Sequence, residues 1–193
     1  MEYDKITHLL GLDVGSVTVK IAVVEKESLN LVYHDYQRHN SQQSVCVLKL
    51  LKAAHKKFKG ANFALAICGS GGPQIAKTLN AFFVQEVVAN SIAIKHHYNN
   101  VGLAIELGGQ DAKVIFFNKN DLDGELQVSD MRMNGSCAGG TGAFIDQIAT
   151  LLAVKTEDFE ALAQAGKLVY DISGRCGVFA KTDFRRPDTG NAG

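Results

Sequence analysis

The chain has 193 residues, of which 46% are hydrophobic and 21% are charged, and this composition is typical of a globular protein. Its 20 basic and 20 acidic residues cancel to a formal charge of zero, which indicates neither nucleic acid nor an acidic membrane as a partner. No apolar run approaches the ~18 residues of a membrane-spanning helix and the start has no signal-peptide pattern, so we expect a cytoplasmic protein.

The first part of the chain alternates between short apolar runs and helical patterns. Strands are predicted over 6–12, 17–24, 29–36 and 63–68, and helices over 41–57, capped by Ser41, and over 85–98. The predicted core-facing residues of the two helices are Val45, Leu48, Leu51 and Lys52 in the first, and Val88, Ile92 and the stem of Lys95 in the second. These elements form a predicted first domain over residues 1–98.

The pattern then starts again, which predicts a second domain over residues 99–193. Strands are predicted over 102–107, 112–117 and 126–131, and helices over 141–152 and 157–165. Thr156 is the expected N-cap of the last helix, and Gly166 suits its C-terminal end.

A short pattern recurs at a constant offset in the two parts. Glu106 lies 93 residues after Asp13 (106 minus 13), and the same offset pairs Gly15 with Gly108 and Lys20 with Lys113. Any two strand-turn-strand units look broadly alike, but three matches at one offset favour an internal duplication.

Each copy of the pattern carries groups that suit phosphate and magnesium. Glycine-rich turns expose backbone N–H groups to phosphate oxygens, and an acid beside them can hold Mg²⁺ through water. The predicted catalytic residues are Asp13, Glu106 and Gln110, and the predicted nucleotide-binding residues on the two turns are Gly15, Ser16, Thr18, Lys20, Gly108, Gly109 and Asp111. A single acid-glycine turn is more often only a turn, and Glu86 could face the same site or only cap a helix.

Other nucleotide motifs do not fit the chain. It has no P-loop sequence, and the glycine-rich turn over 69–72 is followed by Pro73 and lacks dinucleotide-binding spacing.

Four stretches together resemble one family. They are VQEVVAN at 84–90, IELGGQDAK at 105–113, NGSCAGGTG at 134–142 and RCGVFAKTD at 175–183. With the two turns, they resemble the activator ATPases of 2-hydroxyacyl-CoA dehydratases and the ATPase subunits of benzoyl-CoA reductase, in the superfamily of actin, heat-shock chaperone ATPases and sugar kinases. The resemblance runs from about Leu10 to Asp183. It implies an α/β fold of duplicated, actin-like (ribonuclease H-like) ATPase domains with mixed sheets flanked by helices, the second domain being incomplete.

The resemblance also implies a role for two of the four cysteines. In that family two cysteines per subunit bind one 4Fe-4S cluster shared across a homodimer, and the matching residues are Cys137 and Cys176. Gly139, Gly140 and Thr141 belong to the same motif and are predicted to bind the cofactor. The alternative is that both cysteines are small buried residues, which is the interpretation we give to Cys46 and Cys68.

The function implied by the resemblance is ATP-driven electron transfer. A donor such as ferredoxin or flavodoxin would reduce the cluster, and ATP with Mg²⁺ would drive an electron to an iron–sulfur dehydratase or reductase acting on acyl-CoA. The alternatives are a sugar or acyl kinase on the same scaffold and a non-catalytic nucleotide-sensing module. Residues 185–193 do not match the family's continuation, so we expect a truncated chain with a weakened adenosine site.

Overall fold

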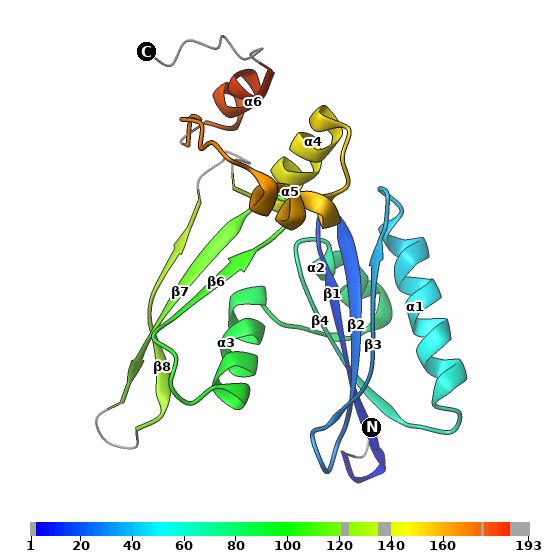
Figure 1. The fold of residues 1–193 in the computed structure, drawn as a ribbon. Helices are drawn as coiled ribbons and strands as arrows, with labels where there is room; N and C mark the ends of the chain where they lie inside the picture. Colours follow the sequence, from blue (N-terminus) through cyan, green and yellow to red (C-terminus); the bar gives the residue numbers. More distant parts are fainter. Residues whose placement is uncertain (1–2, 121–123, 135–139, 175, 186–193) are drawn as a thin grey trace, which may run out of the picture. The chain divides into compact units, whose positions relative to one another are not determined.

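The computed structural model describes residues 3–120, 124–134, 140–174 and 176–185, and its chain divides into two compact units (Figure 1). The first unit comprises Met1–Val101 with Asn118–Val128, and the second comprises Gly102–Phe117 with Ser129–Gly193. No helix in the described part of the chain has both the length and the apolar character needed to cross a bilayer.

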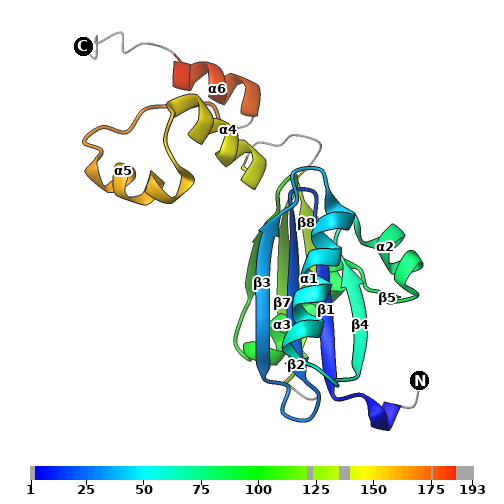
Figure 2. The ribbon, with the colours of Figure 1, turned by 90° about the vertical axis from the view of Figure 1, so that its right-hand side faces the viewer.

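The first unit is built on a five-stranded mixed sheet. Its elements are η1 (Tyr3–Lys5), β1 (His8–Val14), β2 (Thr18–Glu25), β3 (Leu31–Arg38), α1 (Gln43–Lys57), β4 (Phe63–Cys68), α2 (Gly72–Leu79), β5 (Phe82–Phe83) and α3 (Glu86–His97). The strand order is β3-β2-β1-β4-β5, with β1 antiparallel to β2 and parallel to β4. Helix α1 runs along one face of this sheet (Figure 2).

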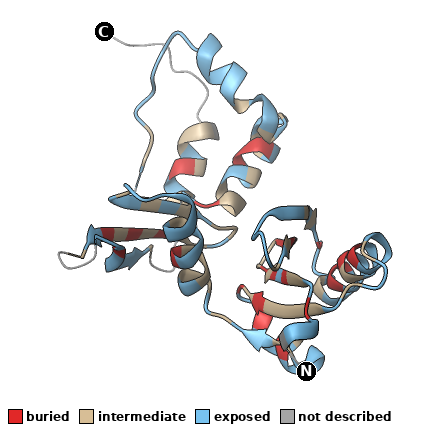
Figure 3. Cartoon of the chain, turned by 90° about the horizontal axis from the view of Figure 1, so that it is seen from below, coloured by how far each residue is buried: buried red, intermediate tan, exposed pale blue. Residues whose placement is uncertain are grey.

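The core of this unit lies between the sheet and α1. Because side chains alternate across a strand, one face of β1 and β2 is uniformly apolar and is buried. Figure 3 colours the buried residues of the chain red. The cluster consists of Leu10, Leu12, Val14, Val19, Ile21, Val23, Cys46, Val47, Leu50, Ala54, Ile67 and Ala76. The expectation that Cys46 is a core residue is therefore confirmed.

The face of α1 that points to the core differs from the predicted one, although Leu51, one of the four predicted residues, does pack against the core. Val45 and Leu48 are 61% and 53% exposed, whereas Val47 and Leu50 are buried. Apolar residues occupy both sides of this helix, so the spacing alone did not select the correct side. Ser41 does not cap it either, because Gln42 holds the N-cap position and no side chain accepts a capping hydrogen bond.

Two further parts of the first unit depart from expectation. Helix α2 and strand β5 were not predicted, although Pro73 in the first turn is a common helix-start signal. In α3, Val88 and Ile92 are largely exposed and Ser91 is the buried residue, so the predicted apolar stripe is wrong.

The remaining elements form a smaller sheet and a set of helices. They are β6 (Leu103–Leu107), β7 (Ala112–Lys119), β8 (Leu126–Met133), α4 (Gly142–Leu152), η2 (Thr156–Asp158), α5 (Phe159–Ala165) and α6 (Gly177–Arg185). The sheet order is β6-β7-β8, so β6 lies at an edge. Thr156 begins η2 and Asp158 holds the N-cap of α5, so the predicted cap is wrong. Gly166 ends α5 in an extended conformation with φ −63° rather than a left-handed one.

Candidate functional site

The first hairpin joins β1 and β2 and carries an acid opposite a lysine. Asp13 is paired with Lys20 across the two strands, and the Lys20 Nζ lies 2.7 Å from Asp13 Oδ2. The Gly15 N–H donates to the Thr18 carbonyl at 2.9 Å and closes the turn. Strand β1 extends to Val14, two residues beyond the predicted end, so Asp13 is held by the pleat of a strand rather than by a loop.

The hairpin of β6 and β7 repeats this arrangement 93 residues later. Glu106 is paired with Lys113, and the Gly108 N–H donates to the Asp111 carbonyl at 2.8 Å. Each of these four residues corresponds to a residue of the first hairpin at the offset of 93, and Asp111 corresponds to Thr18. The predicted duplication is thus confirmed at the level of strand register and turn hydrogen bonding.

The two lysines differ in how far solvent reaches them. The Lys113 side chain is 7% exposed and its Nζ lies 3.5 Å from Glu106 Oε1 and 3.1 Å from Asp111 Oδ2. The Lys20 side chain is 47% exposed and pairs with Asp13. The first hairpin therefore offers an accessible ammonium. In the second hairpin two carboxylates surround a buried ammonium, and this excess of negative charge suits a cation more than an anion.

One oxygen of Asp13 has an unsatisfied hydrogen-bonding capacity. Asp13 Oδ1 is buried and has no hydrogen-bond partner, while Oδ2 accepts from Lys20. Burial lowers the pKa of Lys20, but the hydrogen bond and charge of Asp13, with the nearby Tyr36 and Glu86, raise it more, so the pKa lies above its ordinary value. Lys20 is therefore an ammonium at neutral pH, beside a carboxylate oxygen that can still receive a proton donor or a cation.

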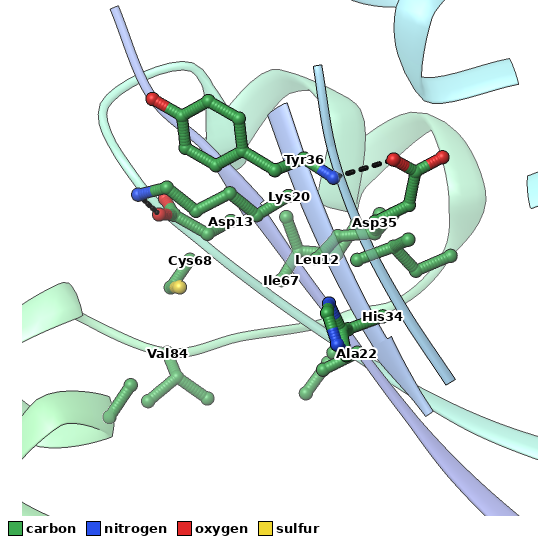
Figure 4. Close-up of a pocket in the computed structure, with 14 residues that line it drawn as sticks. Leu12, Asp13, Lys20, Ala22, His34, Asp35, Tyr36, Ile67, Cys68 and Val84 are labelled. Carbon is green, nitrogen blue, oxygen red and sulfur yellow. Dashed lines mark hydrogen bonds and ion pairs between the residues drawn. The ribbon is translucent and has the colours of Figure 1, made fainter. Parts of the chain in front are cut away.

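These groups line a hollow of about 440 Å³ on the sheet face opposite α1 (Figure 4). Figure 4 shows the Asp13–Lys20 pair with Tyr36 beside it and Cys68 nearby. The register places Cys68 directly opposite Asp13 on β4. The expectation that Cys68 is a core residue is therefore wrong, since it is partly exposed and lines this hollow.

The backbone after β4 approaches Asp13 closely at Gly69. Its φ is +89°, and a Cβ added there would lie 2.5 Å from both Asp13 Oδ1 and the Val14 carbonyl oxygen. Gly71 then donates its N–H to the same carbonyl at 2.8 Å. The glycine-rich turn over 69–72 thus packs against the first hairpin and restricts the position of Asp13.

We expect Gly69→Ala to destabilise the protein by at least about 2 kcal/mol more than Gly60→Ala, because a clash is added to the backbone strain. Gly60 is a matched control, since its φ is +81° and nothing lies within 4 Å of an added Cβ. Urea unfolding of both variants measures the difference. Equal losses in the two variants would contradict the proposed close packing against Asp13.

The structure describes part of the predicted cysteine motif. Cys137 and Gly139 lie outside the described residues. Cys176 directly precedes α6, its carbonyl accepts the Ala180 N–H at 2.9 Å, and its thiol is free and partly exposed. Gly140 has φ +81° and Thr141 is fully buried at the start of α4. Within the described ranges, no three His, Cys, Asp or Glu side chains gather as a metal site.

Sequence reasoning missed three residues that hold the hairpins. Asn134 binds Ala112 twice: its side-chain Oδ1 accepts the Ala112 N–H at 2.8 Å, and its backbone N–H donates to the Ala112 carbonyl at 3.0 Å. In the first hairpin, His39 Nε2 and Gln43 Nε2 lie 3.2 and 3.1 Å from the Gly15 carbonyl oxygen. A polar residue following a third strand was the available signal, and by itself it is weak. Gln110, by contrast, lies exposed on the β6–β7 turn.

Two glycine-turn hairpins with an acid–lysine pair, each followed by a third strand and a helix, define an actin-like ATPase fold. A model of the BadF/BadG/BcrA/BcrD ATPase family matches residues 10–192, and the chain belongs to this family.

Several characterised relatives are activator proteins. The chain is 29% identical over 178 residues to the (R)-2-hydroxyglutaryl-CoA dehydratase activating ATPase of Acidaminococcus fermentans, covering 91% of this chain and 65% of that one. The crystal structure of component A of that dehydratase matches with a TM-score of 0.74 at 27% identity, over 92% of this chain and 66% of that one. A Clostridium difficile activator of 2-hydroxyisocaproyl-CoA dehydratase, solved with ADPNP, shares the fold at 23% identity and TM-score 0.72, over 91% and 63% of the chains. The chain thus spans just under two thirds of these relatives.

Proposed function

We propose that this chain forms the phosphate-binding part of an ATPase that activates an acyl-CoA dehydratase or reductase by transferring an electron to it. The observation that carries the proposal is the repetition of the acid-glycine-lysine hairpin in a chain of this ATPase family. The names of the relatives, which are activators of 2-hydroxyacyl-CoA dehydratases, support the choice of partner.

The described residues fit a magnesium nucleotide in two respects. The exposed Lys20 ammonium suits a phosphate, and the unsatisfied Asp13 Oδ1 suits a water molecule of hydrated Mg²⁺. Glu106 and Asp111 provide a second acidic centre, and Gln110 on the same β6–β7 turn could orient the attacking water. The positioned carboxylates and turn amides would stabilise the charge that develops at the transferred phosphoryl group.

We further propose that Cys137 and Cys176 hold a 4Fe-4S cluster in a homodimer. The partly exposed Cys176 thiol beside the first turn of α6 fits a cluster ligand, because free N–H groups of a helix start favour thiolate charge. A four-iron cluster usually takes four thiolates, and two subunits that each provide two cysteines would meet this number. The bound cluster would supply one-electron transfer.

The proposal includes a reductant and a cellular setting. A low-potential donor such as ferredoxin or flavodoxin would reduce the protein, and the partner would be an iron–sulfur enzyme. We propose a cytoplasmic location without nucleic-acid or membrane partners.

An anaerobic reconstitution tests the whole proposal. Full-length protein, a 2-hydroxyacyl-CoA dehydratase component and dithionite are mixed with ATP or with a non-hydrolysable analogue, and dehydration of the acyl-CoA is followed. We expect turnover with ATP and at least about 100-fold less with the analogue, because hydrolysis would drive the electron transfer. Equal turnover without ATP, or without this protein, would reject the activator role.

A further inference from the structure

The carbonyl of Gly15, at the tip of the first hairpin, accepts hydrogen bonds from two side chains that are distant in sequence. His39 Nε2 lies 3.2 Å from this oxygen and is 24 residues away in the chain. Gln43 Nε2 lies 3.1 Å from it and is 28 residues away. His39 is 7% exposed, so its ring is fixed within the fold.

The second ring nitrogen of His39 determines the tautomer. The Ser41 N–H donates to His39 Nδ1 at 3.1 Å, so Nδ1 must be the acceptor. In a neutral imidazole the other nitrogen then carries the proton. His39 Nε2 is therefore a donor to the Gly15 carbonyl, and the contact is a genuine hydrogen bond in this tautomer.

The connection between β3 and α1 is strained in a way that serves this contact. Asn40 and Ser41 are consecutive non-glycine residues with φ of 45° and 64°. Such conformations cost free energy and persist where the surrounding structure imposes them. Here they bring the backbone N–H of Ser41 to His39 Nδ1. The backbone N–H of His39 donates to the Val17 carbonyl at 3.2 Å. One residue thus holds two carbonyls of the turn.

Fixing the Gly15 carbonyl also fixes the N–H of Ser16. The described chain has no cis peptide bond, and in a trans peptide the C=O and the following N–H point in opposite directions. Because the carbonyl is directed to His39 and Gln43, the Ser16 N–H is directed away from them. The two side chains therefore set the direction of a backbone donor at the tip of the turn.

The second half of the chain restrains the corresponding carbonyl, that of Gly108, from the same place in the fold. Gly108 corresponds to Gly15 at the offset of 93, and its carbonyl accepts the Gly142 N–H at 2.9 Å. Gly142 is the first residue of α4, which follows the third strand of its sheet. Gln43 is the first residue of α1, which also follows a third strand. One half uses a backbone donor and the other uses side chains, which indicates that the direction of this peptide is the feature that both halves maintain.

We propose that His39 and Gln43 are positioning residues that direct the Ser16 N–H toward a nucleotide phosphate. The inference rests on the proposed nucleotide site and adds two residues to it. Neither side chain touches the nucleotide; both act through the Gly15–Ser16 peptide.

Two substitutions of His39 separate this role from a purely structural one. In His39→Gln the amide nitrogen can occupy the place of Nε2 and donate to Gly15, whereas in His39→Asn the side chain can still accept from Ser41 but cannot reach Gly15. We expect the Kd for MgATP of full-length protein to rise about tenfold in His39→Asn, because one hydrogen bond is lost. In His39→Gln, which can keep this hydrogen bond, we expect the Kd to rise no more than about threefold. If His39 only shaped the loop through Ser41, the order of the two variants would be reversed.

Gln43 provides a second test that does not disturb the β3–α1 connection. Gln43→Met keeps the side-chain length and removes the donor, and we expect about a fivefold higher Kd for MgATP with an unchanged Kd for AMP, which lacks the outer phosphates. The double variant His39→Asn with Gln43→Met should lose more affinity than the product of the single effects, because only then has the carbonyl lost both side-chain donors.

The outcomes distinguish a failure of the proposed function from a failure of this inference alone. No MgATP binding by wild-type protein in calorimetry would overturn the proposed function and this inference with it. Wild-type binding with the same Kd in His39→Asn, Gln43→Met and the double variant would overturn this inference alone.

Discussion

ATP hydrolysis by full-length protein is expected to fall at least about 100-fold when Asp13 is replaced by asparagine, with the fold retained. Asparagine keeps the shape of the side chain but removes the charge that would organise Mg²⁺ and its waters. The structure gives this carboxylate one oxygen bound to Lys20 and one buried oxygen without a partner. Phosphate release at saturating MgATP measures the effect, and thermal unfolding checks that the variant is folded.

Asp130→Asn is the matched control for this experiment. Asp130 also lies on a strand and pairs with a cation, Arg132, at 3.1 Å, but its side chain is 52% exposed. Exposed pairs of this kind contribute little, so turnover should be unchanged. Turnover of Asp13→Asn within a few fold of wild type would remove Asp13 from the catalytic residues.

The second large effect concerns iron. After anaerobic reconstitution we expect about four irons per dimer of full-length protein, and loss of this iron in Cys137→Ala and in Cys176→Ala. The cluster needs every one of its thiolates, so one substitution per subunit removes two of the four. Iron counting, visible absorption and sizing of the same samples measure the result.

The other two cysteines serve as controls for the iron assignment. Cys46 is buried in the core and Cys68 lines the hollow beside Asp13, so Cys46→Ala and Cys68→Ala should keep their iron. Four irons per monomer would show that one chain holds the entire cluster. Iron retained in Cys176→Ala would show that this cysteine is not a ligand.

Much of the fold could be predicted because it is encoded in local patterns. Alternating apolar residues identified β1, β2, β6 and β7, and the repeated acid, glycine and lysine predicted a duplicated hairpin. The structure adds the matching registers, which pair Asp13 with Lys20 and Glu106 with Lys113. The side of α1 that is buried could not be predicted, since Val45 and Leu48 are as apolar as Val47 and Leu50. Packing against the sheet determines which residues of α1 are buried, and the sequence of the helix alone does not specify that packing.

The candidate site was predictable only for the residues on the turns themselves. His39 and Gln43 contact Gly15 across 24 and 28 residues, and they do so through the left-handed conformations of Asn40 and Ser41. The sequence predicted a connection between the strand over 29–36 and the helix over 41–57. Because neither Asn40 nor Ser41 is a glycine, it did not predict two consecutive left-handed conformations in that connection. Contacts of this kind depend on the completed fold and are visible only in the structure.

The edge position of β6 has a practical consequence for handling the protein. On β1, Leu10, Leu12 and Val14 are buried, whereas their counterparts at the offset of 93, Leu103, Ile105 and Leu107, are 44%, 64% and 62% exposed. An apolar strand at a sheet edge is a template for pairing with other copies. Turbidity on concentrating this chain would therefore report reversible association of native molecules rather than denaturation, and dilution, not refolding, would be the way to recover them.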